Sequence, residues 1–179
     1  MGGVTLLAFP IPTFLALYYF EGISPLDVLD LGNLQFDKLA LGIVIGMLYA
    51  VIALAFMQSS VFDPLPNRVE TMVKRMNLSI WDCFFLAVCA GMGEELLFRS
   101  GVQYYLGPLI TSVIFVAIHG YLNPMNWRMS LYGIIVLPFI LIISYALEEF
   151  GLWFCIGAHF SYDLVLFLMM RAAAIEARS

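Results

Sequence analysis

The sequence predicts an all-α, polytopic membrane protein, a bundle of about six transmembrane helices. Of its 179 residues, 63% are hydrophobic and 12% are charged, and the mean hydropathy is +0.95. A soluble domain is about half apolar and about a quarter charged. The apolar residues also fall into runs close to the roughly 20 residues that cross a bilayer as a helix.

The distribution of Lys and Arg predicts the orientation, with both termini cytoplasmic, because basic residues favour cytoplasmic loops. In this orientation Lys38 lies in an outer loop and Arg99 lies inside a span. The other basic residues fall on the cytoplasmic side: Arg68, Lys74, Arg75, Arg128, Arg171 and Arg178. The expected spans are 4–20, 39–57, 80–104, 107–123, 130–147 and 152–170.

A single membrane domain over 1–179 is expected, since no internal repeat is evident. The net charge of −5 and the pI of 4.8 argue against nucleic acid as a partner. In the second span, Gly42 and Gly46 are spaced to let another helix approach closely. We expect them to serve packing within the chain. The sequence does not indicate an oligomeric state.

Ionisable side chains inside the apolar runs give the main functional signal. A charged residue at bilayer depth costs about 2.5–3.5 kcal/mol on insertion scales, so it usually lines a pathway or a reaction site. The chain has two histidines, and both fall in apolar stretches. The residues concerned are Glu94, Glu95, Arg99, His119, His159 and Asp163.

Helical spacing separates the two adjacent glutamates. Neighbouring helix positions point about 100° apart, so Glu94 and Glu95 are not expected to face one site. Glu95 and Arg99 are four residues apart with the acid first, the favourable order for a helical ion pair. We therefore interpret Glu95–Arg99 as a structural ion pair and Glu94 as the carboxylate that faces a cavity.

The histidines come from two other spans. His159 and Asp163 are four residues apart and share one helix face. His119 lies towards the inner end of its span, whereas Glu94 lies towards the outer end of the span before it. The two can meet if the third helix extends beyond Arg99 or if the fourth continues through Tyr121 towards Asn126. We expect the long third helix.

Three motifs resemble those of the CPBP family, the CAAX-protease and bacteriocin-processing (Abi) intramembrane proteases. They are EExxxR at Glu94–Arg99, FxxxH at Phe115–His119 and HxxxN/D at His159–Asp163. The resemblance covers about residues 79–170, which form the expected protease core. It implies an all-helical intramembrane endopeptidase that cleaves a membrane-associated protein or peptide.

The resemblance also implies roles for four catalytic residues. Glu94 would be the general base, and His119 would help it hold the hydrolytic water. His159 and Asp163 would stabilise the oxyanion or position the substrate. The eukaryotic CAAX prenyl proteases have Asn where this chain has Asp163, which makes the oxyanion role of that position less secure.

Two mechanisms remain open from the residues alone. A buried glutamate can act as a general base without a metal. The set Glu94, His119, His159 and Asp163 could also bind a divalent metal such as zinc, with one position open for water. No cofactor is certain.

Two other functions compete with proteolysis. A non-proteolytic scaffold or immunity protein could retain the motifs for folding. A proton-coupled transporter could use Glu94 and the histidines as a relay, although no inverted repeat is visible. The composition, small size and absence of a eukaryotic sorting signal predict an integral protein of a prokaryotic cytoplasmic membrane.

Overall fold

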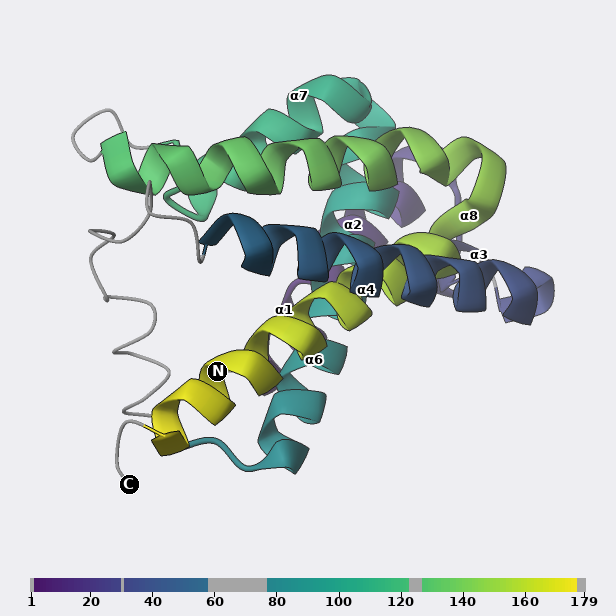
Figure 1. The fold of residues 1–179 in the computed structure, drawn as a ribbon. Coiled ribbons are helices and arrows are strands. Elements are labelled where there is room, and N and C mark those ends of the chain that lie inside the picture. Colours follow the sequence, from purple (N-terminus) through teal and green to yellow (C-terminus); the bar gives the residue numbers. More distant parts are fainter. Residues whose placement is uncertain (1, 30, 58–76, 123–126, 177–179) are drawn as a thin grey trace.

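The computed structural model describes residues 2–29, 31–57, 77–122 and 127–176, and in these ranges the chain is helical without a strand (Figure 1). Arg68, Lys74, Arg75 and Arg178, which support the expected orientation, lie outside the described residues. The helices are α1 (Gly2–Ala8), α2 (Pro10–Ala16), η1 (Leu17–Glu21), α3 (Pro25–Leu29), η2 (Leu31–Asn33), α4 (Phe36–Met57), α6 (Ile80–Glu95), η3 (Leu96–Val102), α7 (Gln103–Ile118) and α8 (Trp127–Glu176). Of these, η1 and η3 are π-helical and η2 is a 3-10 helix.

Within the described ranges, four helical segments are long and apolar enough to cross a membrane. Two of them, Gly2–Glu21 and Phe36–Met57, correspond to the expected spans 4–20 and 39–57. Of the other two, Ile80–Ile118 contains the expected span 80–104 and most of 107–123, and Ser130–Glu176 contains both 130–147 and 152–170. The all-helical membrane fold is confirmed, and the count of six spans stays a prediction.

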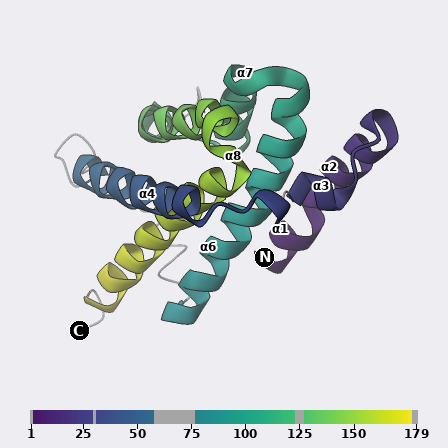
Figure 2. The same ribbon diagram turned by 90° about the vertical axis from the view of Figure 1, so that its right-hand side faces the viewer.

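Each of the two long segments is interrupted at one glycine. Gly107 has φ 74° and ψ 170°, and Gly151 has φ 79° and ψ 175°. Side chains other than hydrogen are strongly disfavoured in this backbone region. At each glycine the helix turns back. In Figure 1 α8 reverses direction, and in Figure 2 the chain rising from α6 arches over at the top, beside the α7 label. These turns lie where the sequence analysis placed the ends of expected spans.

The main core lies between α4, η3, α7 and the two halves of α8. Its fully buried members include Val116, Phe139, Ile140, Ile143 and Ala158. At the crossing of α4 and α8, a Cβ added at Gly46 would lie 2.0 Å from the carbonyl oxygen of Ala158. The Gly42/Gly46 pair therefore packs against another helix of the same chain.

Helix α6 is the central element that carries the first motif. Ser79 caps its start: the Ser79 side chain accepts from Asp82 N–H at 3.1 Å, and Ser79 N–H donates to the Asp82 carboxylate at 2.8 Å. Helices α1 and α2 pack on α6 and η3, while α4 lies on the other side of α6 (Figure 2). This arrangement leaves one face of α6 towards α7 and α8.

Candidate active site

Glu94 and His119 face each other across the hairpin formed by α6, η3 and α7. Glu94 Oε2 lies 3.4 Å from His119 Nε2, with the Glu94 side chain 14% exposed and that of His119 31% exposed. The third helix does continue beyond Arg99, through η3 to the break at Gly107. From Gly107, Glu94 is 13 residues back (107 − 94) and His119 is 12 residues on (119 − 107), so the two positions are level in the hairpin.

The backbone selects the ring nitrogen that His119 presents to Glu94. His119 Nδ1 lies 2.7 Å from the carbonyl oxygen of Phe115. Because a carbonyl can only accept, Nδ1 carries a proton. The ring also stacks on the Phe115 ring, with centroids 4.3 Å apart. In neutral His119, Nε2 is then a hydrogen-bond acceptor, and it faces the Glu94 carboxylate, which is also an acceptor. Two acceptors can be held together only by a proton on one of them or by a donor molecule between them.

A second group of polar side chains, Arg99, Glu95 and His159, connects η3 to α8 behind the pocket. Arg99 Nε is 2.8 Å from Glu95 Oε2, the pairing that their spacing predicts. The other carboxylate oxygen, Glu95 Oε1, accepts from Nδ1 of His159 at 2.8 Å. The side chains of Glu95 and Arg99 are 0% exposed. Glu95 thus connects the buried arginine to one of the site histidines.

His159 presents its other ring nitrogen to Asp163. The distance from His159 Nε2 to Asp163 Oδ2 is 3.6 Å, longer than an ordinary hydrogen bond. Since Nδ1 donates to Glu95, the tautomer of neutral His159 leaves Nε2 free on the pocket side. The two histidines are therefore held alike: each Nδ1 is anchored, and each Nε2 is directed to a carboxylate.

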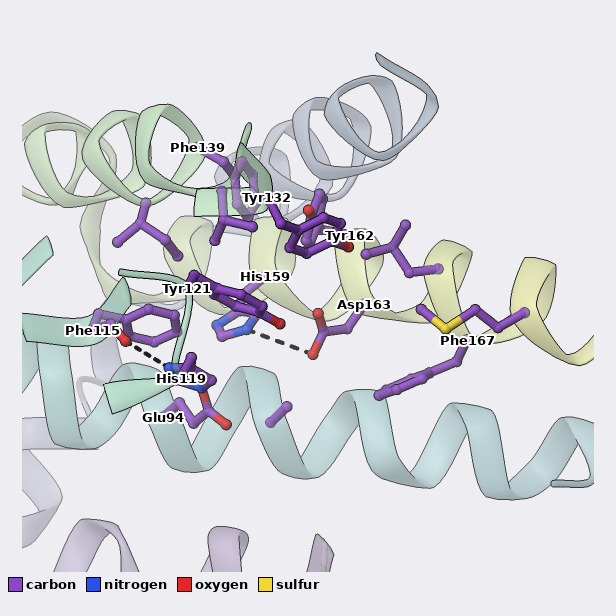
Figure 3. A pocket seen from close by; sticks show the side chains of 15 residues that line it. Glu94, Phe115, His119, Tyr121, Tyr132, Phe139, His159, Tyr162, Asp163 and Phe167 are labelled. Carbon is purple, nitrogen blue, oxygen red and sulfur yellow. Dashed lines mark hydrogen bonds and ion pairs between the residues drawn. The ribbon is translucent and has the colours of Figure 1, made fainter. Parts of the chain in front are cut away.

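All four predicted catalytic residues line one pocket with a volume of about 260 Å³ (Figure 3). One end carries Glu94, His119, His159 and Asp163. The rest is aromatic and aliphatic, formed by Ala90, Phe115, Tyr121, Tyr132, Val136, Phe139, Ile140, Tyr162, Leu166, Phe167 and Met170. Such a cavity, mostly apolar with a few convergent polar groups, is typical of a binding or catalytic site.

Tyr121 brings a hydroxyl group to this pocket from the segment after α7. Gly120, at φ 77°, ends the helix, and Tyr121 N–H donates to the Val116 carbonyl at 3.2 Å. A tyrosine hydroxyl is protonated at neutral pH and can donate a hydrogen bond.

The four residues do not form a metal-ligand set in this arrangement. Among the described residues, no three His, Cys, Asp or Glu side chains gather closely enough to hold a metal ion. The two Nε2 atoms face different carboxylates, Glu94 for His119 and Asp163 for His159. A zinc site with three protein ligands needs all three within about 2.0–2.2 Å of one point.

Comparison with known proteins identifies the family. The model of a family described as type II CAAX prenyl endopeptidase Rce1-like matches residues 76–165, which is 90 of 179 residues (165 − 76 + 1). The match spans every motif residue of the pocket. The chain belongs to this Rce1-like family. The resemblance to the CPBP proteases is thereby confirmed, and this is a family of proteases. Searches of curated proteins and of solved structures each returned no match.

Two features of this Rce1-like protein were not predicted from its motifs. The link from Glu95 to His159 connects positions 64 residues apart, and helical spacing carries no information about contacts between helices. The lining by Tyr121, Tyr132 and Tyr162 was also missed. Tyr162, three residues after His159, shares its helix face, and that spacing was an available signal.

Proposed function

We propose that this chain is an intramembrane endopeptidase in which Glu94 activates a water molecule to hydrolyse a peptide bond of a membrane-associated protein or peptide. The observation that carries the proposal is the Glu94–His119 pair at the polar end of an otherwise apolar pocket. Membership in a protease family supports the reaction class. The geometry of the two residues supports their roles.

A water between Glu94 and His119 would donate one proton to each. His119 Nε2 is an acceptor when Nδ1 donates to Phe115, and the Glu94 carboxylate is the second acceptor. Both protons of the water are then engaged, so an oxygen lone pair is directed at the substrate carbonyl. Glu94 takes a proton as the C–O bond forms and delivers it to the leaving amine as the C–N bond breaks.

His159 and Asp163 act on the substrate side of this water. The Glu95 carboxylate holds His159 in place, and a protonated His159 can donate through Nε2 to a substrate carbonyl. An ionised Asp163 would repel a developing oxyanion, so we assign it to orient His159 and the substrate. The proposed mechanism needs no metal, because Glu94 and His119 can hold the water and Glu94 can take its proton.

The substrate is proposed to reach a site at mid-depth in the membrane. Exposed aromatic residues, which favour membrane interfaces, occur at the start of α6 as Trp81 and near Gly107 as Tyr104. The two residues are 23 positions apart (104 − 81), which corresponds to about 35 Å of helix, and Glu94 lies near the midpoint. Lipidated C-terminal peptides, suggested by the family description, peptide leaders and anchored precursors are the candidate substrates.

We further propose six spans with both termini cytoplasmic, in a prokaryotic cytoplasmic membrane. The reversals at Gly107 and Gly151 support two spans in each long segment. The basic residues concentrated outside the expected outer loops support the orientation.

The test compares the membrane peptidomes of cells expressing wild type, Glu94→Gln and Glu148→Gln at matched abundance. Glu148 is exposed and belongs to the other Glu-Glu pair of the chain, so it provides a matched control. We expect peptide termini that occur with wild type and Glu148→Gln and disappear with Glu94→Gln. Their sequences would reveal the cleavage site.

The opposite result has an equally clear meaning. If the three peptidomes were identical and the host phenotype persisted in Glu94→Gln, proteolysis would be refuted. The chain would then act as a membrane scaffold or immunity protein that uses its polar residues for folding.

A further inference from the structure

The polar end of the pocket is rich in acceptors and poor in free donors. Glu94 and Asp163 accept when ionised, and the Nδ1 protons of His119 and His159 are already engaged by Phe115 and Glu95. Peptide hydrolysis places negative charge on the carbonyl oxygen, and positioned donors stabilise that charge. Apart from Nε2 of a protonated His159, the side-chain donors available to this end are the hydroxyl groups of the tyrosines that line the pocket.

Tyr121 is held firmly at the catalytic end. Its backbone is fixed by the turn at Gly120, and its carbonyl oxygen packs so near Gly133 that an added Cβ would lie 2.6 Å away. The Tyr121 ring lies parallel to the His119 ring, with centroids 6.1 Å apart and planes 9° apart. On the other side it contacts the ring of Tyr132, at 5.1 Å.

The hydroxyl of Tyr121 lies beside the His159–Asp163 pair, which we assign to the substrate side. Figure 3 draws the Tyr121 ring above His119 and across His159, with its oxygen towards Asp163. Tyr162 is less suited, because its ring stacks on Phe139 at 4.5 Å and its hydroxyl is fully buried. Figure 3 also draws Tyr132 and Tyr162 farther from Glu94 than Tyr121 is.

We propose that the Tyr121 hydroxyl donates a hydrogen bond to the carbonyl oxygen of the scissile peptide and stabilises the oxyanion of the tetrahedral intermediate. The hydroxyl keeps its proton throughout, so the proton transfers remain those between water, Glu94 and the leaving amine. This inference rests on the proposed proteolytic function. It assigns Tyr121 as a catalytic residue outside the three motifs.

The experiment removes the hydroxyl and keeps the ring. Purified wild type, Tyr121→Phe, Tyr145→Phe and Glu94→Gln are each mixed with membranes from cells that express Glu94→Gln. The rate at which new peptide termini appear is then measured by mass spectrometry. Tyr145 is an exposed tyrosine elsewhere on α8 and serves as the matched control. We expect Tyr145→Phe to retain the wild-type rate and Tyr121→Phe to lose about 10²–10³-fold, as when one oxyanion donor is removed.

Two further measurements separate catalysis from folding. Thermal unfolding in lipid nanodiscs is expected to be the same for Tyr121→Phe and wild type. A ring-fluorinated tyrosine at position 121, which is a more acidic donor, is expected to retain cleavage where Phe does not. If wild type cleaved, Glu94→Gln did not and Tyr121→Phe matched wild type, this inference alone would be overturned. If wild type produced no new termini, the proposed function would fail as well.

Discussion

At the scale of single residues, the buried side chains of Arg99, Glu95 and His159 contact one another in series. These contacts affect both the stability of the fold and the position of a site histidine. A carboxylate without solvent is costly unless it is paired and hydrogen-bonded. Arg99 and His159 occupy the two oxygens of Glu95. The guanidinium also lies 5.8 Å from the centroid of the Phe115 ring, which in turn stacks on His119. Both histidines of the site therefore depend on this one buried cluster.

Replacing Arg99 should destabilise the fold because it leaves Glu95 as an uncompensated buried charge. We expect Arg99→Met to lower the free energy of unfolding by about 3–5 kcal/mol, measured by chemical unfolding in detergent. The double variant Arg99→Met/Glu95→Gln removes both charges and should recover much of the loss. It should not recover cleavage, since His159 has lost its anionic partner. Full activity in the double variant would contradict the link between Glu95 and His159.

Removing metal ions should leave the activity unchanged. The described ligand atoms do not gather around one point, and the proposed mechanism relies on Glu94 and His119. Enzyme dialysed against 1,10-phenanthroline should cleave membrane substrates at the rate of mock-dialysed enzyme. A loss that added Zn²⁺ specifically restored would show instead that the four polar residues rearrange around a metal.

At the scale of the elements, close contact between α4 and α8 sets the position of His159. Gly46 lies against Ala158, the residue before His159, and an added Cβ would also lie 2.2 Å from Ser161 Oγ. Backbone atoms cannot yield as a flexible side chain can. Any side chain at Gly46 must therefore push the two helices apart.

We expect Gly46→Val to lower both the thermal stability and the cleavage rate. Gly3→Ala is a suitable control, because a Cβ there would have nothing within 4 Å. Unfolding temperature and initial rate would be compared for the two variants and wild type. Equal values in all three would show that α4 and α8 are not in contact at this point.

The pairing of Glu94 with His119 could have been predicted from the distance of each residue along the sequence to the turn between their helices. Gly107-Pro108 marks a turn, and the two residues lie almost equally far from it. Their depths in two separately assigned spans predict a gap between them that a longer third helix would close. The Glu95–Arg99 pair was predictable because both residues lie on one helix. The His159–Glu95 contact was not, because it depends on how α8 packs against α6.

At the scale of the whole molecule, apolar composition predicts the membrane fold better than it predicts where helices begin and end. The expected connections near 105 and 150 lie inside long helical segments that turn at a single glycine. Hydropathy identifies apolar length and carries no information about a backbone angle. The remaining connection, around 58–79, falls largely outside the described residues.

Labelling of introduced cysteines should establish the orientation. The native Cys83, Cys89 and Cys155 are buried, so their background reaction should be low. With a membrane-impermeant maleimide on intact cells, we expect Glu148→Cys to be labelled. Ser179→Cys should be labelled after lysis and not before. Labelling of both variants on intact cells would contradict a topology with a cytoplasmic C-terminus and an outer loop at 148.

The division of the pocket between two hairpins bears on how the protein is made. Glu94 and His119 belong to the hairpin of α6, η3 and α7, whereas His159 and Asp163 belong to α8, which follows it along the chain. Chains fold from the N-terminus as they are synthesised. A nascent molecule therefore has only Glu94 and His119 of the proposed site until α8 has been synthesised. Under the proposed mechanism, the site is complete only once α8 has packed against α6.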